Sequence, residues 1–136
     1  LWTLGAAYLI FGSLNMVSSI VTAMLMGLGI DYIVHIYTRL EAAQALSYKA
    51  VEHYNHDRYI AKGPISFETT KLISMAKVFV GDLSGEIMDT CVQFHGGMGY
   101  LEDLWVARAF RDARLFRIGG GTTEVMRYAI AKILGF

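Results

Sequence analysis

Two hydrophobic patterns follow one another along the chain. Residues 1–30 are almost entirely apolar and carry no charge. A helix needs about 20 apolar residues to cross a bilayer. Residues 1–11 are too few and are predicted to be the end of a helix, followed by a turn at residues 12–15. Residues 16–37 are long enough to span, and Arg39 then marks an interface with water.

The second pattern is a series of amphipathic helices. Apolar residues recur at helical spacing first at Leu40, Ala43, Leu46, Ala50 and Tyr54. No proline interrupts residues 16–59, so we expect one nearly continuous helix of roughly 40 residues across the change of pattern. Pro64 or Ser66 opens the next helix. Its longer stripe consists of Leu72, Ala76, Phe79, Val80, Leu83, Ile87 and Cys91.

Glycine clusters separate the remaining predicted helices. Residues 95–99 end the long helix, and residues 119–121 form a second break. Between the breaks we predict a helix with Glu102 and Asp103 in its first turn. Its last turns hold the basic residues Arg111, Arg114 and Arg117.

The second glycine break precedes a last helix. Thr122 or Thr123 caps this helix, Glu124 lies in its first turn, and it stops at Gly135. Gly81 and Gly85 lie inside the long helix that ends at residues 95–99, and they predict close contact between that helix and a neighbouring helix. No stretch alternates with period two, so the expected fold class is all-α.

Charge divides the chain at the same place. Of 24 Asp, Glu, Lys and Arg residues, only Asp31 lies in residues 1–38. The formal net charge is zero, which gives no support for nucleic-acid binding. A single cysteine, Cys91, excludes an internal disulfide and is expected in the core. His53 and His56 form a solvated pair in our interpretation, and no metal site is predicted.

Asp31 is the chemically informative residue of the first segment. An ionisable group in an apolar span is costly and therefore a functional hypothesis. Tyr32 beside it and His35 one turn later are suited to relay a proton, although an Asp31 near the helix end is simply hydrated. Residues 27–35, Gly-Leu-Gly-Ile-Asp-Tyr-Ile-Val-His, resemble the fourth membrane helix of resistance-nodulation-division exporters of the MMPL type. The resemblance implies a proton-relay role for the Asp31–Tyr32 pair.

The two glycine breaks are the other candidates for chemistry. Each leads toward a helix N-terminus, where backbone amides can approach a flat or anionic ligand. Either break alone is more often a tight packing turn. Three segments taken together resemble the end of the C-terminal helical domain of acyl-CoA dehydrogenases, a match over residues 42–136. They are Gln93-Phe94-His95-Gly96-Gly97-Met98-Gly99-Tyr100, Arg111-Asp112-Ala113-Arg114 and Ile118-Gly119-Gly120-Gly121-Thr122-Thr123-Glu124-Val125-Met126-Arg127.

This resemblance implies a flavin enzyme that oxidises acyl-CoA thioesters. A base removes the α proton while the β hydrogen leaves as hydride to FAD. The resemblance implies that a loop from each subunit contacts the FAD of a neighbour in a tetramer; its residues are Gln93, Phe94, His95, Gly96 and Gly97. Thr122, Thr123 and Glu124 match the segment that closes over FAD. Gly120 and Gly121 match the stretch beside the acyl thioester.

The departure from the family pattern lies at the base. Most members carry the catalytic glutamate where this chain has Gly120. Some members have glycine there and carry the glutamate on the first helix of the C-terminal domain, in whose place this chain has the exporter-like segment. Glu124 matches a different family position. We therefore expect no catalytic base in the chain and no activity of the isolated polypeptide.

Three interpretations remain open. The first is an incomplete acyl-CoA dehydrogenase C-terminal helical bundle, residues 40–136, behind an exporter-like membrane segment, residues 1–39. The second is a membrane proton-relay fragment carrying an inert bundle. The third is a non-functional fusion. The first two predict attachment to a membrane through residues 1–38, with the bundle in the cytoplasm. Lys77 and Asp112 are expected only in structural ion pairs.

Overall fold

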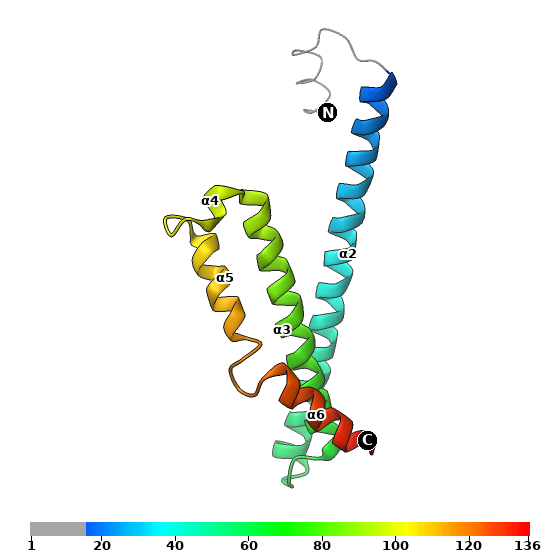
Figure 1. The fold of residues 1–136 in the computed structure, drawn as a ribbon. Coiled ribbons are helices and arrows are strands. Elements are labelled where there is room, and N and C mark those ends of the chain that lie inside the picture. The colour runs from blue at the N-terminus through cyan, green and yellow to red at the C-terminus, as the bar shows by residue number, and fades with distance from the viewer. Residues whose placement is uncertain (1–15) are drawn as a thin grey trace. The chain divides into compact units, whose positions relative to one another are not determined.

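The computed structural model describes residues 16–136, and only the backbone of residues 16–18. The segment and turn predicted within residues 1–15 lie outside the described residues. The chain divides into two compact units, Leu1–Thr38 and Arg39–Phe136. The helices follow the order α2, η1, α3, α4, α5, α6 (Figure 1). The described residues form helices and connecting turns, without a strand, and the predicted all-α class is confirmed.

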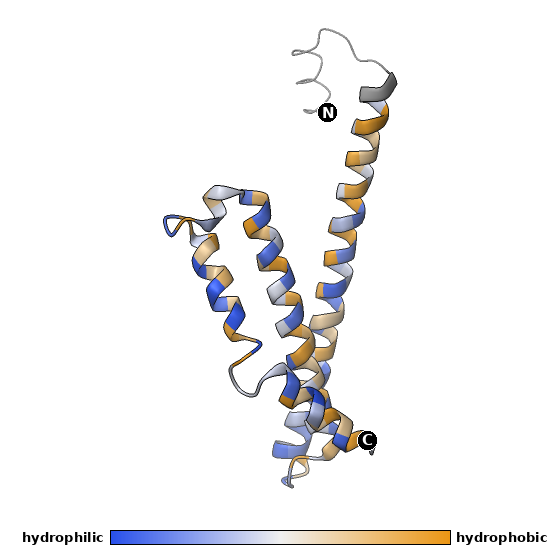
Figure 2. Cartoon of the chain, in the orientation of Figure 1, coloured by the Kyte–Doolittle hydropathy of each residue, from blue (hydrophilic) through white to orange (hydrophobic). Residues whose placement is uncertain are grey.

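Helix α2 covers Met16–Asn55 and continues into the π-helical turn η1, His56–Ile60. The prediction of one nearly continuous helix over residues 16–59 is confirmed, with its last turn widened. Within Ser19–Ile60 an 18-residue stretch has a mean hydropathy of 1.6 and no buried residue. The apolar colouring of this part of α2 is visible in Figure 2. By length and composition alone, this helix is able to cross a membrane.

Helix α3, Phe67–His95, is the centre of the second unit. It packs against α5, Trp105–Leu115, and against α6, Thr123–Leu134. The buried apolar residues of these helices are Leu72, Leu83, Val106, Ala107 and Ala113, and Ala43 and Ala50 of α2 are buried as well. Arg39 Nη1 lies 2.5 Å from Glu86 Oε2, which ties α2 to α3. The small core is therefore built around α3, whose buried residues also include Thr69, Ser74 and Gly81.

The start of α3 is fixed by its cap and by an acidic residue of η1. Ser66 is the N-cap, and its hydroxyl accepts a hydrogen bond from Thr69 N at 3.1 Å. Asp57 Oδ2 accepts from Ser66 N at 2.9 Å and from Thr69 Oγ1 at 2.7 Å. These hydrogen bonds, that of Thr69 first, hold the pKa of Asp57 well below its usual range.

The two glycines inside α3 permit a close approach, as predicted. A Cβ on Gly81 would lie 3.3 Å from Phe116 O, and one on Gly85 would lie 3.6 Å from the Arg117 side chain. The neighbour is the segment just after α5 rather than a helix. Its backbone rests directly on α3 because Gly81 has no side chain, whereas the Arg117 side chain lies over Gly85.

Two details of the predicted connections are wrong. The first glycine break contains a helical turn of its own, α4, Gly97–Tyr100. Helix α5 begins only at Trp105, so Glu102 and Asp103 precede it, and Arg117 follows its end. The two carboxylate oxygens of Glu102 accept hydrogen bonds from Arg111 Nη1 and Nη2, at 2.5 and 2.7 Å. That pairing lowers the pKa of Glu102 and raises that of Arg111.

The ends of α6 agree with the sequence prediction. Thr122 is its N-cap, and the Thr122 hydroxyl accepts a hydrogen bond from Val125 N at 3.4 Å. Gly135 closes the helix in the left-handed conformation, with φ at 88°. The capping residues, which satisfy free backbone groups, determine both boundaries.

Candidate functional site

The two glycine segments lie at different heights along α3. Lys77, in the first half of α3, donates a hydrogen bond to the carbonyl of Gly121. Gln93 follows Lys77 by 16 residues on the same helix. At 1.5 Å per residue, the two levels are about 24 Å apart. One chain therefore does not bring its two predicted flavin segments together.

The first segment covers residues 93–97, at the end of α3. Gln93 and Phe94 are exposed, and Gly96 turns the chain with φ at 55°. His95 Nδ1 lies 2.7 Å from the carbonyl of Cys91, so its ring caps its own helix. Cys91 is half-buried beside the core rather than enclosed in it.

Gly97 and Gly99 of α4 have opposite surroundings. A Cβ on Gly99 would lie 2.7 Å from Val92 O, so Gly99 is needed for α4 to rest on α3. A Cβ on Gly97 would meet nothing within 4 Å. Packing within the chain thus explains Gly99 and leaves an open surface at Gly97. This difference was not predictable from the sequence, because both glycines belong to one motif.

The second segment, residues 119–121, has a backbone that favours glycine. Gly120 has φ at 66° and Gly121 has φ at 105°. A Cβ on Gly121 would overlap the methyl carbon of Met126, and one on Gly120 would lie 3.8 Å from Lys77 Cε. Lys77 therefore bonds a carbonyl rather than forming the expected ion pair, and its Cε lies beside Gly120.

The N-terminus of α6 is occupied by its own side chains. The backbone amide of Glu124 and then the Thr122 hydroxyl donate to the Glu124 carboxylate, which lowers the pKa of Glu124. Thr123 is buried, and its amide donates to Arg117 O at 3.2 Å. The first turn offers a ligand the polar groups of Thr122 and Glu124 rather than free amides for a phosphate.

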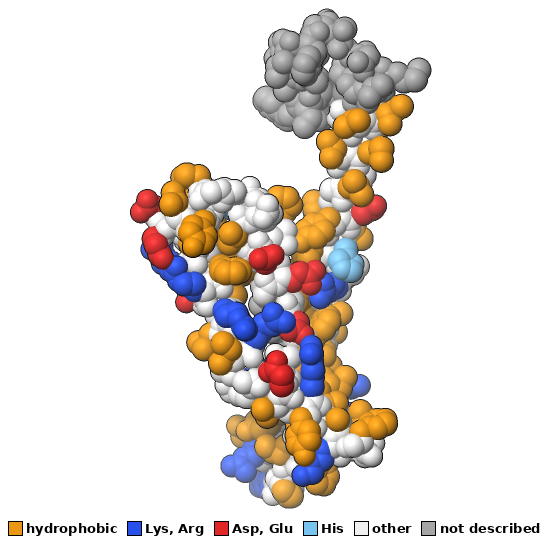
Figure 3. Space-filling model, viewed as in Figure 1, with side chains coloured by type: hydrophobic (Ala, Val, Ile, Leu, Met, Phe, Trp, Pro, Cys, Tyr) orange, Lys and Arg blue, Asp and Glu red, His pale blue; other side chains and the backbone are white. Residues whose placement is uncertain are grey.

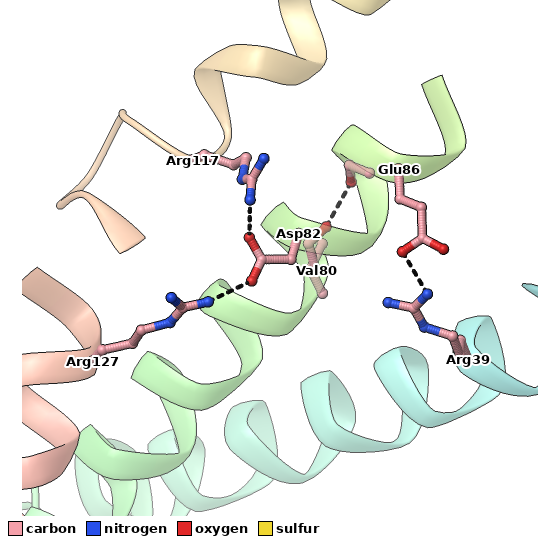
Figure 4. Close-up of polar contacts among 7 residues, drawn as sticks. Arg39, Val80, Asp82, Glu86, Arg117 and Arg127 are labelled. Carbon is pink, nitrogen blue, oxygen red and sulfur yellow. Dashed lines mark hydrogen bonds and ion pairs between the residues drawn. The ribbon is translucent and has the colours of Figure 1, made fainter. Parts of the chain in front are cut away.

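A charged cleft that sequence reasoning missed lies next to this turn. Asp82 of α3 faces two guanidinium groups (Figure 4). Arg127 Nη2 donates a hydrogen bond to Asp82 Oδ2 at 3.0 Å. Arg117 Nη2 lies 2.7 Å from Asp82 Oδ1 and forms an ion pair with it, but the geometry is not that of a hydrogen bond. Figure 3 shows acidic and basic side chains gathered on this face. The cleft measures about 410 Å³ and is lined by Asp82, Gly85, Glu86, Asp89, Phe110, Arg114 and Arg117.

The remaining candidates lie on α2. The side chains of Asp31, Tyr32 and His35 are all exposed. His53 and His56 line an open groove of about 630 Å³, and His56 Nδ1 lies 3.7 Å from Asp57 Oδ1. Among the residues that the structure describes, no three His, Cys, Asp or Glu side chains are grouped to hold a metal ion.

The long capped α3, the helices α5 and α6 that pack against it, and the glycine turns between them define an all-α helical bundle. A profile of the family described as "Acyl-CoA dehydrogenase, C-terminal domain" matches residues 30–135. The chain belongs to this family. The match begins within the segment expected to resemble an exporter and includes Asp31 and Tyr32.

Individual relatives agree with the family assignment. The chain is 37% identical over 95 residues to cyclohexane-1-carbonyl-CoA dehydrogenase of Geobacter metallireducens, covering 70% of this chain and 23% of the relative. It is 36% identical over 97 residues to the caffeyl-CoA reductase–Etf complex subunit CarC of Acetobacterium woodii, covering 71% and 23%. A long-chain specific mitochondrial acyl-CoA dehydrogenase of Sus scrofa is 46% identical over 59 residues, covering 43% and 14%. The chain therefore spans less than a quarter of the length of these relatives.

Proposed function

We propose that residues 40–136 supply the flavin-contacting helical part of an acyl-CoA dehydrogenase. The observation that carries the proposal is the open surface at Gly97, which the chain's own packing does not explain. A flat ligand or a neighbouring subunit that packs against this glycine accounts for the missing side chain. The family match over the same residues supports this choice of ligand.

The open surface at Gly97 and the polar groups of Thr122 and Glu124 support FAD as the group that the two segments would hold. When bound, FAD would accept the hydride that leaves the β carbon of an acyl-CoA. In this proposal one subunit contributes Gln93, Phe94, His95, Gly96 and Gly97, and a neighbour in a tetramer contributes Thr122, Thr123 and Glu124. The separation of about 24 Å between the two levels of α3 supports a division of this kind.

The acyl thioester is proposed to lie beside Gly120 and Gly121. A Cβ on Gly120 would lie 3.8 Å from Lys77 Cε, an ordinary contact, so this position has room for a substrate but supplies no base, whereas the methyl group of Met126 fills the space beside Gly121. Glu124 is tied to its own amide and to Thr122, and its lowered pKa makes it a weak base. The proton at the α carbon therefore has to be taken by a carboxylate from outside residues 42–136.

Flavin binding tests the first part of the proposal. FAD is titrated into the 136-residue chain and followed by quenching of flavin fluorescence. We expect saturable binding that weakens at least tenfold in Gly97→Leu, which adds a side chain without an internal clash. Ala45→Leu, an exposed change on α2, is the matched control. Equal affinity in all three chains contradicts the proposed flavin contact.

A graft tests the missing base. Residues 42–136 are joined to the preceding domains and first C-terminal helix of a dehydrogenase whose base lies on that helix. This graft is expected to oxidise acyl-CoA with Gly120 unchanged, whereas the unmodified chain with added FAD is inactive. A donor that carries its base in the glycine loop is expected to give an inactive graft, rescued by Gly120→Glu. Turnover by the unmodified chain overturns the argument.

A second proposed function concerns the first unit. We propose that residues 1–38 attach the chain to a membrane, with the bundle in the cytoplasm, and that the exporter-like Asp31–Tyr32 pair relays protons. The unburied apolar stretch of α2 supports membrane attachment. A non-functional fusion of the two parts is the alternative origin for the change of pattern near Arg39, and the DNA sequence upstream and across codons 36–44 tests that origin.

Proton flux tests the relay. The chain is reconstituted into liposomes loaded with a pH-sensitive dye, and a pH step is applied. Flux that Asp31→Asn abolishes and Glu41→Gln preserves is expected for a relay. No flux above empty liposomes, with insertion verified, contradicts the relay and leaves membrane attachment as the role of the segment.

A further inference from the structure

Lys77 of α3 forms a long-range contact for which the proposed chemistry has no use. It is half-buried, and its ammonium donates to the carbonyl of Gly121, 44 positions along the chain. Its neighbours on α3 are apolar or bond locally, as Ser74 does to the carbonyl of Thr70 at 2.9 Å. A half-buried cation directed at a single carbonyl requires a reason.

The loop that Lys77 reaches has few other restraints. Gly119 N donates to Leu115 O at 2.7 Å, which fixes where the loop leaves α5. Thr123 N donates to Arg117 O at 3.2 Å, which fixes where the loop enters α6. Among the hydrogen bonds described for the stretch between these points, the bond from Lys77 is the one that comes from another helix. Gly120 and Gly121 have left-handed conformations that glycine readily leaves, so the flexible stretch depends on this bond.

The stem of Lys77 explains how the ammonium is aimed. A pocket of about 320 Å³ beneath the loop is lined by Lys77, Val80, Gly81, Leu115, Phe116 and Gly119. The aliphatic carbons of Lys77 lie against this apolar wall, while the charged end reaches the polar carbonyl. Lys77 Cε lies 3.8 Å from the position of a Cβ on Gly120, so stem and ammonium follow the loop across both glycines.

We propose that Lys77 is a positioning residue that holds the loop of residues 119–121 in one conformation through the Gly121 carbonyl. The loop leads directly into Thr122, so its conformation sets where the polar groups of the α6 N-terminus lie. This role deepens the proposed flavin function and rests on it for its consequence. The loop conformation itself is measurable without flavin.

Amide hydrogen exchange of the full chain, without FAD, is the direct test. Lys77→Met keeps the aliphatic stem and removes the donor, and Lys77→Arg keeps a cationic donor. We expect exchange at Gly119 and Thr123, whose hydrogen-bonded amides lie at the two ends of the loop, to rise at least tenfold in Lys77→Met and less than threefold in Lys77→Arg. The mid-helix amides of α3 and α6 should stay protected. Lys71→Met is the matched control, because Lys71 bonds Glu68 on the same helix at 2.6 Å.

The outcomes separate a positioning role from a structural one. Unchanged loop exchange in Lys77→Met overturns the proposal. An equal rise in the loop, α3 and α6 also overturns it, since that result describes general destabilisation. If Lys77→Met does not fold, a measurement on the unmodified chain tests the proposal instead. Ammonium protons of Lys77 that exchange at least fivefold more slowly than those of exposed Lys132 support the proposal, and equal rates reject it.

A flavin titration then relates the loop to the proposed function. Lys77→Met is expected to weaken FAD binding at least fivefold, with recovery in Lys77→Arg. Wild-type affinity in Lys77→Met overturns the flavin consequence of the proposal. If the unmodified chain does not bind FAD, the proposed function fails, while the exchange result still decides whether Lys77 positions the loop.

Discussion

Gly97 and Gly99 show that the surroundings of a glycine determine whether a side chain could replace its hydrogen. Both belong to α4, yet a side chain on Gly99 would meet the α3 backbone and one on Gly97 would meet open space. The carbonyl of Val92 is part of a helix and has little room to retreat. Glycine at position 99 is therefore a packing requirement, and at position 97 it leaves a surface open.

We predict that Gly99→Ala lowers the free energy of unfolding by about 1–3 kcal/mol, the usual cost of overpacking. Gly97→Ala should change it by less than about 0.5 kcal/mol, as for other exposed substitutions. Urea denaturation followed by circular dichroism measures both. Equal effects of the two substitutions would contradict the packing described for α4.

Residue types and local spacing predicted the site only in part. The start of α6 was predicted correctly because Thr122 and Glu124 carry recognisable capping chemistry. The bond from Lys77 to Gly121 was not predictable, because no local spacing relates a lysine to a carbonyl 44 positions away. The Asp82 ion pairs were missed for the same reason, since Arg117 and Arg127 approach Asp82 only after α5 and α6 have packed on α3.

At the scale of elements, the helix boundaries followed capping rules where caps exist. Ser66 and Thr122 open helices and Gly135 closes one, as expected from groups that satisfy terminal amides and carbonyls. Helix α4 escaped prediction because a four-residue turn with two glycines has almost no intrinsic helix propensity. It forms through its contact with α3, which is tertiary information.

The junction between η1 and α3 predicts a pH dependence of stability. The folded pKa of Asp57 lies below its unfolded value, so its contribution is present above the unfolded pKa of about 4. That contribution decreases as the pH falls through the folded pKa. The pKa values of Glu68 and Glu102 are also lowered in the folded chain, so these carboxylates too lose stabilising free energy as the pH falls. We expect the midpoint of thermal unfolding to fall steadily as the pH is lowered below about 4.

Asp57→Asn isolates the part that Asp57 contributes to this dependence. The variant should be less stable at pH 7 and show a shallower decrease of the midpoint below pH 4, because its amide does not titrate. Asp103→Asn, at an exposed position before α5, is the control. An unchanged slope in Asp57→Asn contradicts the assigned role of Asp57.

At the scale of the whole molecule, the two units predict different behaviour in water. The described part of the first unit exposes large apolar side chains on every turn, among them Met24, Leu25 and Ile33. Apolar surface of this extent marks contact with lipid or protein and otherwise leads to aggregation. The second unit has the mixture of charged and apolar residues typical of a globular surface.

We therefore predict that the chain stays in the membrane fraction after washing with high salt and with alkali, and dissolves only in detergent. A variant that starts at Arg39 should leave the membrane fraction, because it lacks the unburied apolar stretch. Fractionation followed by immunoblotting checks both chains. A full-length chain that is monodisperse without detergent contradicts membrane attachment.

The length of α3 between Lys77 and Gln93 has a genetic consequence. If each flavin is held by residues 93–97 of one subunit and residues 122–124 of another, two differently damaged chains can compensate for each other. Mixed assemblies of a Gly97→Leu chain and a Thr122→Val chain would contain some sites built only from intact segments. Co-expression of two such alleles would then restore part of the flavin content that each allele lacks alone, which is intragenic complementation set by the spacing along one helix.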